Sequence, residues 1–99
     1  MSYTIIFREK ASKEYAQSVL WYKESSVQAA ENFIKQVQLI LTRLEKHPNS
    51  FRRSFKHFHE VKTAKYPYSI VYLIDEEKEQ VVITSIFHQK RNPKLKFRG

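Results

Sequence analysis

The sequence predicts an α+β domain with the element order β-α-α-β-β-β. Residues 66–75 and 81–88 are rich in β-branched and aromatic residues, and a short charged segment joins them, which is typical of a β-hairpin. Residues 30–44 carry apolar side chains at helical spacing. A short apolar run at residues 3–7 favours a first strand. We expect residues 1–99 to form one domain, because a chain of this length can bury only one core.

Positive charge is the strongest signal in the composition. Eighteen Lys and Arg residues against ten Asp and Glu residues give a net charge of +8. A surface of this kind favours an anionic partner, either nucleic acid or an acidic protein. A basic surface that only keeps the protein soluble is the alternative interpretation.

Three absences from the sequence narrow the class of protein. The chain has no cysteine, so it forms no disulfide or thiolate zinc site and is compatible with a reducing cytoplasm. Its start lacks a signal-peptide layout, and no apolar run approaches the ~20 residues of a membrane span. We therefore expect a cytoplasmic protein with no membrane contact.

Gly99 is the only glycine, so tight turns that need a positive φ must use Asn or Asp or be avoided.

The first helix is predicted to begin between Glu9 and Ser12 and to reach about Lys23. Its apolar stripe consists of residues at helical spacing, with Ala16 and Leu20 widening it; the stripe is Ala11, Tyr15, Val19 and Tyr22.

The second helix is predicted to begin at Ser25, because Ser25 and Gln28 have the spacing of a capping box. Pro48 ends it. Its core face is very regular and comprises Ala30, Phe33, Ile34, Val37, Ile40, Leu41 and Leu44. Two helices with so short a link are expected to form an antiparallel hairpin.

Residues 49–56 are predicted to form a loop in which basic and aromatic residues alternate. Arg52, Arg53 and Lys56 are interleaved with Phe51 and Phe55, a pattern that suits single-stranded RNA. The alternative interpretation is that both phenylalanines fill the core beneath the loop.

Residues 57–65 are predicted to form the strand that precedes the hairpin. Alternation places His59, Val61 and Thr63 on one face, and Glu60 and Lys62 on the other.

A hairpin turn centred between Glu77 and Lys78 pairs Tyr72 with Ile83 and Ser69 with Ile86. We expect the bulkier face of the hairpin to meet the helices and the more polar face to be open. The bulkier face holds Tyr68, Ile70, Tyr72, Ile74, Val81, Ile83, Ser85 and Phe87; the other holds Ser69, Val71, Leu73, Val82, Thr84, Ile86 and His88.

Several short motifs in this order resemble the RelE/ParE superfamily of bacterial toxins, which includes plasmid stabilisation proteins. They are Ala11 with Tyr15, Trp21-Tyr22, Phe33 and Leu44 followed by Pro48, the run 65–72 (KYPYSIVY), Val82-Ile83 and the run 88–93 (HQKRNP). The resemblance covers nearly the whole chain. It implies a helical hairpin packed on a twisted antiparallel sheet, and a cognate antitoxin that is usually acidic.

The resemblance implies the toxin of a type II toxin–antitoxin system and leaves its target open. ParE-like members block DNA gyrase without bond-breaking residues of their own, whereas RelE-like members are ribosome-dependent endoribonucleases that cut mRNA without a metal. The segments 66–68 and 88–93 look more like the ParE side. A third possibility is a non-toxic remnant that only binds an antitoxin.

An endoribonuclease needs a base, an acid and cations that stabilise the developing charge. Glu60 would be the base, His88 the acid, and Arg91 a cation together with Lys62 and Lys65. In the alternative interpretation Glu60 and Lys62 only pair at the surface and His88 bonds to the backbone. The residues expected to contact nucleic acid or another target are basic; they are Arg52, Arg53, Lys62, Lys65, Lys90 and Arg91.

We expect no metal and no cofactor. His57 and His59 lie on the same predicted strand face and could ligate a metal together, but no cysteine or carboxylate partner accompanies them. The sequence leaves the oligomeric state open.

The end of the last strand generates a first prediction. In an antiparallel hairpin His88 and Arg91 should approach Lys65, and such a cluster of positive charge favours an anionic contact. Arg91→Ala is expected to reduce growth arrest at matched soluble protein levels, with an unchanged circular dichroism spectrum. Undiminished growth arrest would indicate that the active surface is formed by Arg52 and Arg53 and not by Arg91.

Overall fold

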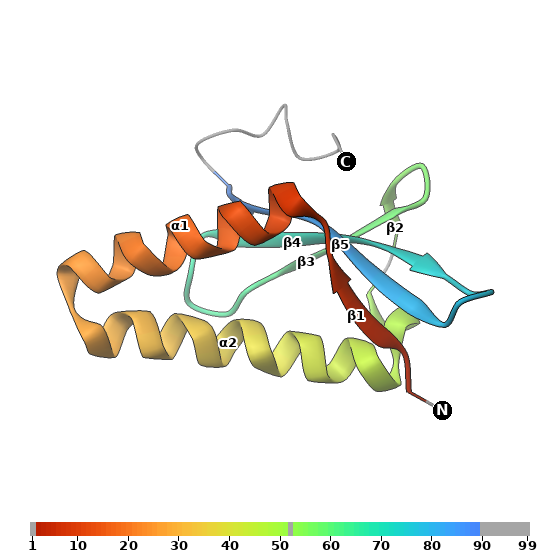
Figure 1. The fold of residues 1–99 in the computed structure, drawn as a ribbon, viewed down its shortest axis with the longest axis horizontal. Coiled ribbons are helices and arrows are strands. Elements are labelled where there is room, and N and C mark those ends of the chain that lie inside the picture. The colour runs from red at the N-terminus through yellow and green to blue at the C-terminus, as the bar shows by residue number, and fades with distance from the viewer. Residues whose placement is uncertain (1, 52, 90–99) are drawn as a thin grey trace.

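The computed structural model describes residues 2–51 and 53–89 (Figure 1). The elements are β1 (Thr4–Phe7), α1 (Glu9–Ser25), α2 (Val27–Lys46), the 3-10 helix η1 (Pro48–Ser50), β2 (Arg53–Phe55), β3 (Phe58–Lys62), β4 (Tyr68–Asp75) and β5 (Gln80–His88). The predicted α+β order is confirmed, with η1 and β2 added.

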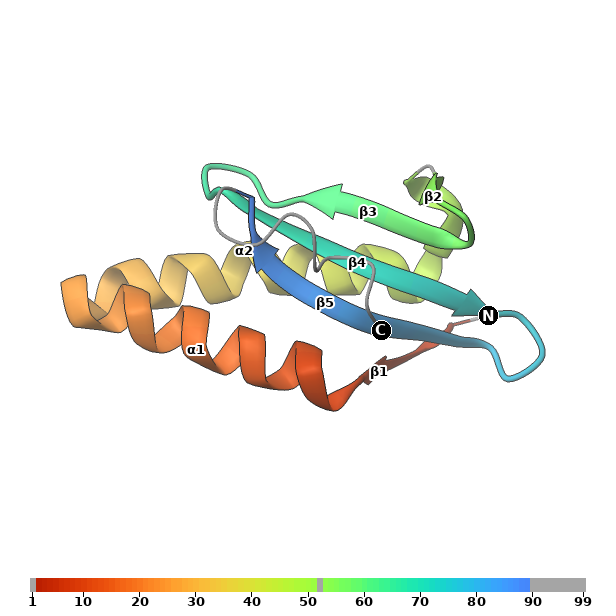
Figure 2. The ribbon, with the colours of Figure 1, turned by 90° about the horizontal axis from the view of Figure 1, so that it is seen from above.

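The five strands form one sheet in the order β1-β5-β4-β3-β2. Strands β2 to β5 are antiparallel neighbours, as the resemblance implies, but β1 lies parallel to β5 and makes the sheet mixed. The direction of β1 is not set by a hairpin turn, because β1 pairs with the last strand and not with its neighbour in sequence. Figure 2 shows the helical hairpin on one face of the sheet, with α2 beneath the strands and α1 beside β5.

The two helices are joined by Ser26 alone. Ser26 has extended backbone angles, and its hydroxyl accepts a hydrogen bond of 2.9 Å from the amide of Ala29, so it is the N-cap of α2. The prediction that Ser25 begins this helix is wrong by one residue, because Ser25 is the last residue of α1. Gln28 does not complete a capping box; its amide donates to Asn32.

The predicted core face of α2 is confirmed in its centre. The buried residues are Ala30, Phe33, Val37, Leu41 and Leu44, whereas Ile34 is exposed at its margin. In α1 the predicted widening of the stripe is wrong. Ala16 is exposed and Leu20 is 60% exposed, because the helix turns Ala11, Tyr15 and Tyr22 toward the core and leaves these two outside.

Phe33 is the centre of an aromatic cluster that joins the helices to the sheet. Its ring lies 5.0 to 6.1 Å, between centroids, from those of Tyr15, Tyr22, Tyr66 and Tyr68. These are the distances at which tilted and edge-to-face aromatic pairs attract each other. Phe33 of α2 therefore connects α1 with the start of β4 through its contacts with these rings.

The segment predicted to be a loop is not entirely irregular, because η1 ends at Ser50 and the short edge strand β2 occupies Arg53–Phe55. Phe51 packs partly buried against the core, with the Arg43 guanidinium 5.6 Å from its ring centroid. Phe55 is 47% exposed. Only one of the two phenylalanines therefore fills the core.

The register of the hairpin changes at a β-bulge. Tyr72 pairs with Ile83 as predicted, but Ser69 pairs with Phe87 and not with Ile86. Thr84 has no partner in this ladder, so the alternation of β5 shifts by one residue beyond it. Ile86 consequently joins the core in place of the predicted Ser85 and Phe87.

The sheet face that was expected to be open also holds buried side chains. Ser69, Val71 and Thr84 are fully buried, and so is nearly all of Phe87. Small hydroxyl groups do not require solvent when they bond within the sheet. Thr84 donates to the carbonyl of Val71, and Ser69 accepts from the side chain of Gln89.

Within residues 2–51 and 53–89, the non-glycine residues with a positive φ are Lys56 at 52°, Lys65 at 70° and Glu79 at 52°. The expectation that Asn or Asp would occupy such positions is wrong. These lie in the turns between β2, β3, β4 and β5, where the chain has no glycine to relieve the left-handed conformation.

Among residues 2–51 and 53–89, neither helix combines the length and the apolar composition that a membrane span requires.

Phe33→Ala tests the aromatic cluster. Phe33 is fully buried, so its truncation is expected to lower the free energy of unfolding by about 3–5 kcal/mol. Leu39→Ala is the matched control on the same helix, because Leu39 is 65% exposed. Denaturant unfolding of both variants checks this, and equal stability losses would contradict the packing described.

Candidate functional site

The candidate site lies where α1 replaces β1 as the neighbour of β5. Strand β1 pairs with β5 only as far as Phe7 and Ile83, and the amide of Arg8 then donates to the carbonyl of Ile83 at 3.0 Å. Beyond this point α1 runs beside β5, whose edge would otherwise expose unpaired backbone groups (Figures 1 and 2).

The carboxylate of Glu14 takes over the pairing of β5. Its Oε1 accepts hydrogen bonds from the amide of Ile86 at 3.1 Å and from the hydroxyl of Ser85 at 3.0 Å. The ammonium group of Lys10 lies 3.4 Å from both carboxylate oxygens and 3.1 Å from the Ser85 hydroxyl. Glu14 therefore satisfies a strand amide that β1 is too short to reach, and Lys10 balances its charge.

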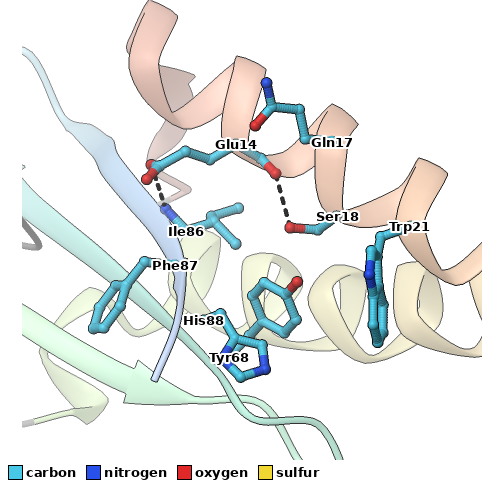
Figure 3. Close-up of a pocket in the computed structure, with 8 residues that line it drawn as sticks. All are labelled: Glu14, Gln17, Ser18, Trp21, Tyr68, Ile86, Phe87 and His88. Atoms are coloured by element: carbon cyan, nitrogen blue, oxygen red, sulfur yellow. Dashed lines mark hydrogen bonds between the residues drawn. The ribbon is translucent and has the colours of Figure 1, made fainter. Parts of the chain in front are cut away.

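A pocket opens next to Glu14, between α1 and the end of β5 (Figure 3). It has a volume of about 270 Å³ and is lined by Glu14, Gln17, Ser18, Trp21, Tyr68, Ile86, Phe87 and His88. Ser18 lies between Glu14 and Trp21 on α1, and its hydroxyl donates to the carbonyl of Glu14 at 2.8 Å. A small residue at this helix position leaves the space that a larger side chain would fill.

Aromatic groups form the far wall of the pocket. The rings of Tyr68 and His88 meet edge to face at 5.2 Å, and Trp21 of α1 is 49% exposed. His88 pairs with Tyr68 across β4 and β5, so both side chains share the face that carries the helices. Without the bulge at Thr84, His88 would lie on the opposite face, as predicted from simple alternation along the strand.

The structure does not bring the predicted acid and base together. His59 and Val61 of β3 are buried and point toward the helices, as His88 does. Glu60 and Lys62 alternate with them along the strand and therefore lie on the opposite face of the sheet. The Glu60 carboxylate accepts a hydrogen bond from Ser54 at 3.2 Å. Ser54 is on β2, so this contact fastens the edge strand to β3.

The remaining predicted target-binding residues are partly described. Arg53 on β2, Lys62 on β3 and Lys65 in the turn before β4 are all exposed. Arg52, Lys90 and Arg91 lie outside the described residues, and so does the predicted meeting of Arg91 with Lys65 and His88.

His59 has a structural role in the described part of the chain. Its ring stacks on Tyr72 at 5.0 Å, and its Nδ1 lies 2.8 Å from the carbonyl oxygen of Phe51. The Tyr72 hydroxyl donates to the carbonyl of Pro48, and burial raises the pKa of Tyr72 to about 12. No group of three or more metal-binding side chains occurs within residues 2–51 and 53–89.

Sequence reasoning missed Glu14 and Ser18. An acidic residue and a serine on a helix are usually read as solvated surface, and periodicity emphasised the apolar stripe beside them. The available signal was spacing: Glu14, Ser18 and Trp21 fall on one row of the helix.

Glu14→Ala should leave the Ile86 amide without a partner and cost about 1–3 kcal/mol of unfolding free energy. Glu14→Gln keeps an acceptor and should retain most of the stability. Glu9→Ala is the matched control, since Glu9 forms only an exposed ion pair with Lys13 on the same helix. Urea unfolding of the three variants decides the matter; a loss for Glu14→Ala no larger than for Glu9→Ala would contradict this role.

Comparisons with known proteins agree with the fold. The chain is similar to a chain of the chromosomal ParDE system from P. aeruginosa, with a TM-score of 0.73 and 12% identity over 88% of this chain and 96% of that one. It is also similar to a free E. coli RelE variant, with a TM-score of 0.63 and 21% identity over 94% and 90%. The RelBE2 complex from Mycobacterium tuberculosis matches with a TM-score of 0.58 and 17% identity over 89% and 99%.

At these identities the structural likeness establishes the fold alone. No curated protein sequence matches the chain. Residues 5–93, however, match the family described as the ParE toxin of the type II toxin–antitoxin system parDE. This match spans nearly the whole sequence. The chain therefore belongs to the ParE toxin family of type II toxin–antitoxin systems.

Proposed function

We propose that this chain is a toxin that acts in the cytoplasm by blocking DNA gyrase and that a cognate acidic antitoxin neutralises it. Membership of the ParE toxin family supports the toxin role. The choice of gyrase over the ribosome, and of binding over cleavage, rests on the arrangement of the site.

The observation that carries this choice is the separation of Glu60 from His88. Glu60 pairs with Val71, which pairs with Ser85, three residues before His88. Strand spacing and rise then put the two backbones about 14 Å apart, with the side chains on opposite faces. A general acid and base must both reach one phosphodiester. The pair that the sequence offered for metal-free RNA cleavage is therefore poorly placed to act on one bond.

A toxin that blocks its target by binding needs a contact surface and no reactive pair. Arg53 on β2, Lys62 on β3 and Lys65 in the turn between β3 and β4 are exposed and offer positive charge. Arg52, Lys90 and Arg91, which lie outside the described residues, are included on the basis of their charge alone. We assign these six residues to the contact with gyrase.

The proposed antitoxin follows from charge and from the named relatives. Several structural relatives are toxin–antitoxin systems or complexes by name, among them ParDE and RelBE2. A chain with a net charge of +8 attracts an acidic partner over a distance set by screening. Neutralisation by an acidic protein would also cover the basic surface that we assign to the target.

Induced expression in bacterial cells, with two readouts, tests the proposal. Blocked gyrase should relax plasmid DNA and arrest growth, with no new 5′ ends in cellular transcripts. New transcript 5′ ends with unchanged supercoiling would show instead a ribosome-dependent endoribonuclease. Normal growth at a high soluble level would identify a non-toxic remnant.

A matched pair of triple variants locates the contact. Alanine at Arg53, Lys62 and Lys65 should reduce growth arrest and DNA relaxation. Alanine at three exposed lysines of the helices, Lys23, Lys35 and Lys46, removes the same charge and should leave both readouts unchanged. Equal effects of the two triple variants would mean that growth arrest depends on the net charge of the protein and not on Arg53, Lys62 and Lys65 in particular.

A further inference from the structure

The pocket beside Glu14 has flat aromatic walls and polar edges. Trp21 presents a ring with about half its surface exposed, and the rings of Tyr68 and His88 face the same space. Gln17 contributes an amide and Ser18 a hydroxyl from α1. Side chains of this kind bind a planar group that carries hydrogen-bonding atoms around its rim.

The electrostatics of the pocket restrict its ligand. Glu14 is the acidic group in the wall, and its carboxylate already accepts from the Ile86 amide and the Ser85 hydroxyl and contacts Lys10. The Glu14 carboxylate is therefore a poor binding partner for the guanidinium or ammonium group of a ligand. A purely apolar anchor fits less well, because it would cover the exposed amide of Gln17 and offer it no hydrogen-bond partner; the hydroxyl of Ser18 already donates to the carbonyl of Glu14.

We propose that this pocket binds one unstacked nucleobase of a single-stranded nucleic acid, with the base stacked on Trp21. A nucleobase is flat and uncharged, so it can stack on the aromatic walls, and its polar edge can form hydrogen bonds with the polar groups at the rim of the pocket. A volume of about 270 Å³ suits one such ring system. A base inside a duplex is stacked on both sides and would have to be extruded first.

The charge of the whole chain supports the same ligand. Single-strand binding combines aromatic stacking with positive charge along the phosphate backbone, and this chain carries a net charge of +8. In sequence, Lys90 and Arg91 follow His88 directly after Gln89. The inference goes beyond gyrase blocking, since it assigns the toxin its own contact with nucleic acid whichever machine it stops.

Trp21 makes the pocket directly observable, because it is the only tryptophan in the chain. A short oligothymidylate and a short oligouridylate, titrated at low salt, should quench its fluorescence saturably. Comparing the two shows whether DNA or RNA is preferred. An abasic oligonucleotide of equal length and charge should bind without quenching, and the corresponding duplex should quench weakly.

Two variants and a control connect the signal to the pocket. Ser18→Leu fills the space, and binding measured by fluorescence quenching should weaken about tenfold or more, within the range known for loss of one stacked base. Trp21→Ala should weaken binding similarly, measured by anisotropy of a labelled oligonucleotide. Leu20→Ala alters the adjacent residue, which is outside this pocket, and should bind as the wild type does. Circular dichroism verifies that each variant is folded.

Several outcomes would overturn the inference. They are no quenching of the wild type, equal quenching by the abasic strand, or unchanged affinity in a folded Trp21→Ala variant. Pocket-dependent binding to gyrase without any oligonucleotide binding would assign the pocket to a protein side chain instead. Because oligonucleotide binding is measured without cells, it can fail while growth arrest and DNA relaxation persist, so the two proposals are tested separately.

Discussion

The bulge in β5, fastened by Glu14, is the constraint on which the arrangement of this toxin depends. One unpaired residue, Thr84, shifts the alternation of the strand, so that Ile86 enters the core and His88 joins Tyr68 on the helix side. The shift occurs just where β1 ends and leaves β5 without a neighbouring strand. Glu14 fills this vacancy by accepting from the Ile86 amide. A bulge, a short edge strand and a partly buried carboxylate thus form one unit.

This unit also separates the two surfaces of functional interest. The pocket of Ser18, Trp21 and His88 lies toward the helices, while Glu60 and Lys62 lie on the other face of the sheet. Residues that look like an acid–base pair in sequence are therefore divided by the sheet itself. The same geometry separates the basic residues that we assign to the target from the aromatic pocket that we propose for a nucleobase. Such an arrangement suits a protein that acts by holding its target.

The sequence predicted those features that depend on repeated local signals. The core face of α2 and the pairing of Tyr72 with Ile83 follow from periodicity and turn placement. The bulge could not be predicted in this way, because Thr84 is an ordinary strand residue and no glycine marks the position. Glu14 escaped notice for a related reason: its partners, Ser85 and Ile86, are remote in sequence, and only the ending of β1 makes them available. The N-cap was misplaced by one residue because Ser25 and Ser26 are both good caps and only packing selects between them.

Backbone NMR of the β4–β5 hairpin can test both the bulge and the hydrogen bond from the Ile86 amide to Glu14. In the bulged register Ser69 lies opposite Phe87, and cross-strand nuclear Overhauser effects should connect these residues, with the Tyr72–Ile83 pair preserved toward the turn. The Ile86 amide should exchange slowly, because Glu14 accepts its hydrogen. Contacts between Ser69 and Ile86, together with rapid exchange of the Ile86 amide, would instead show a regular hairpin that has neither the bulge nor the Glu14 contact.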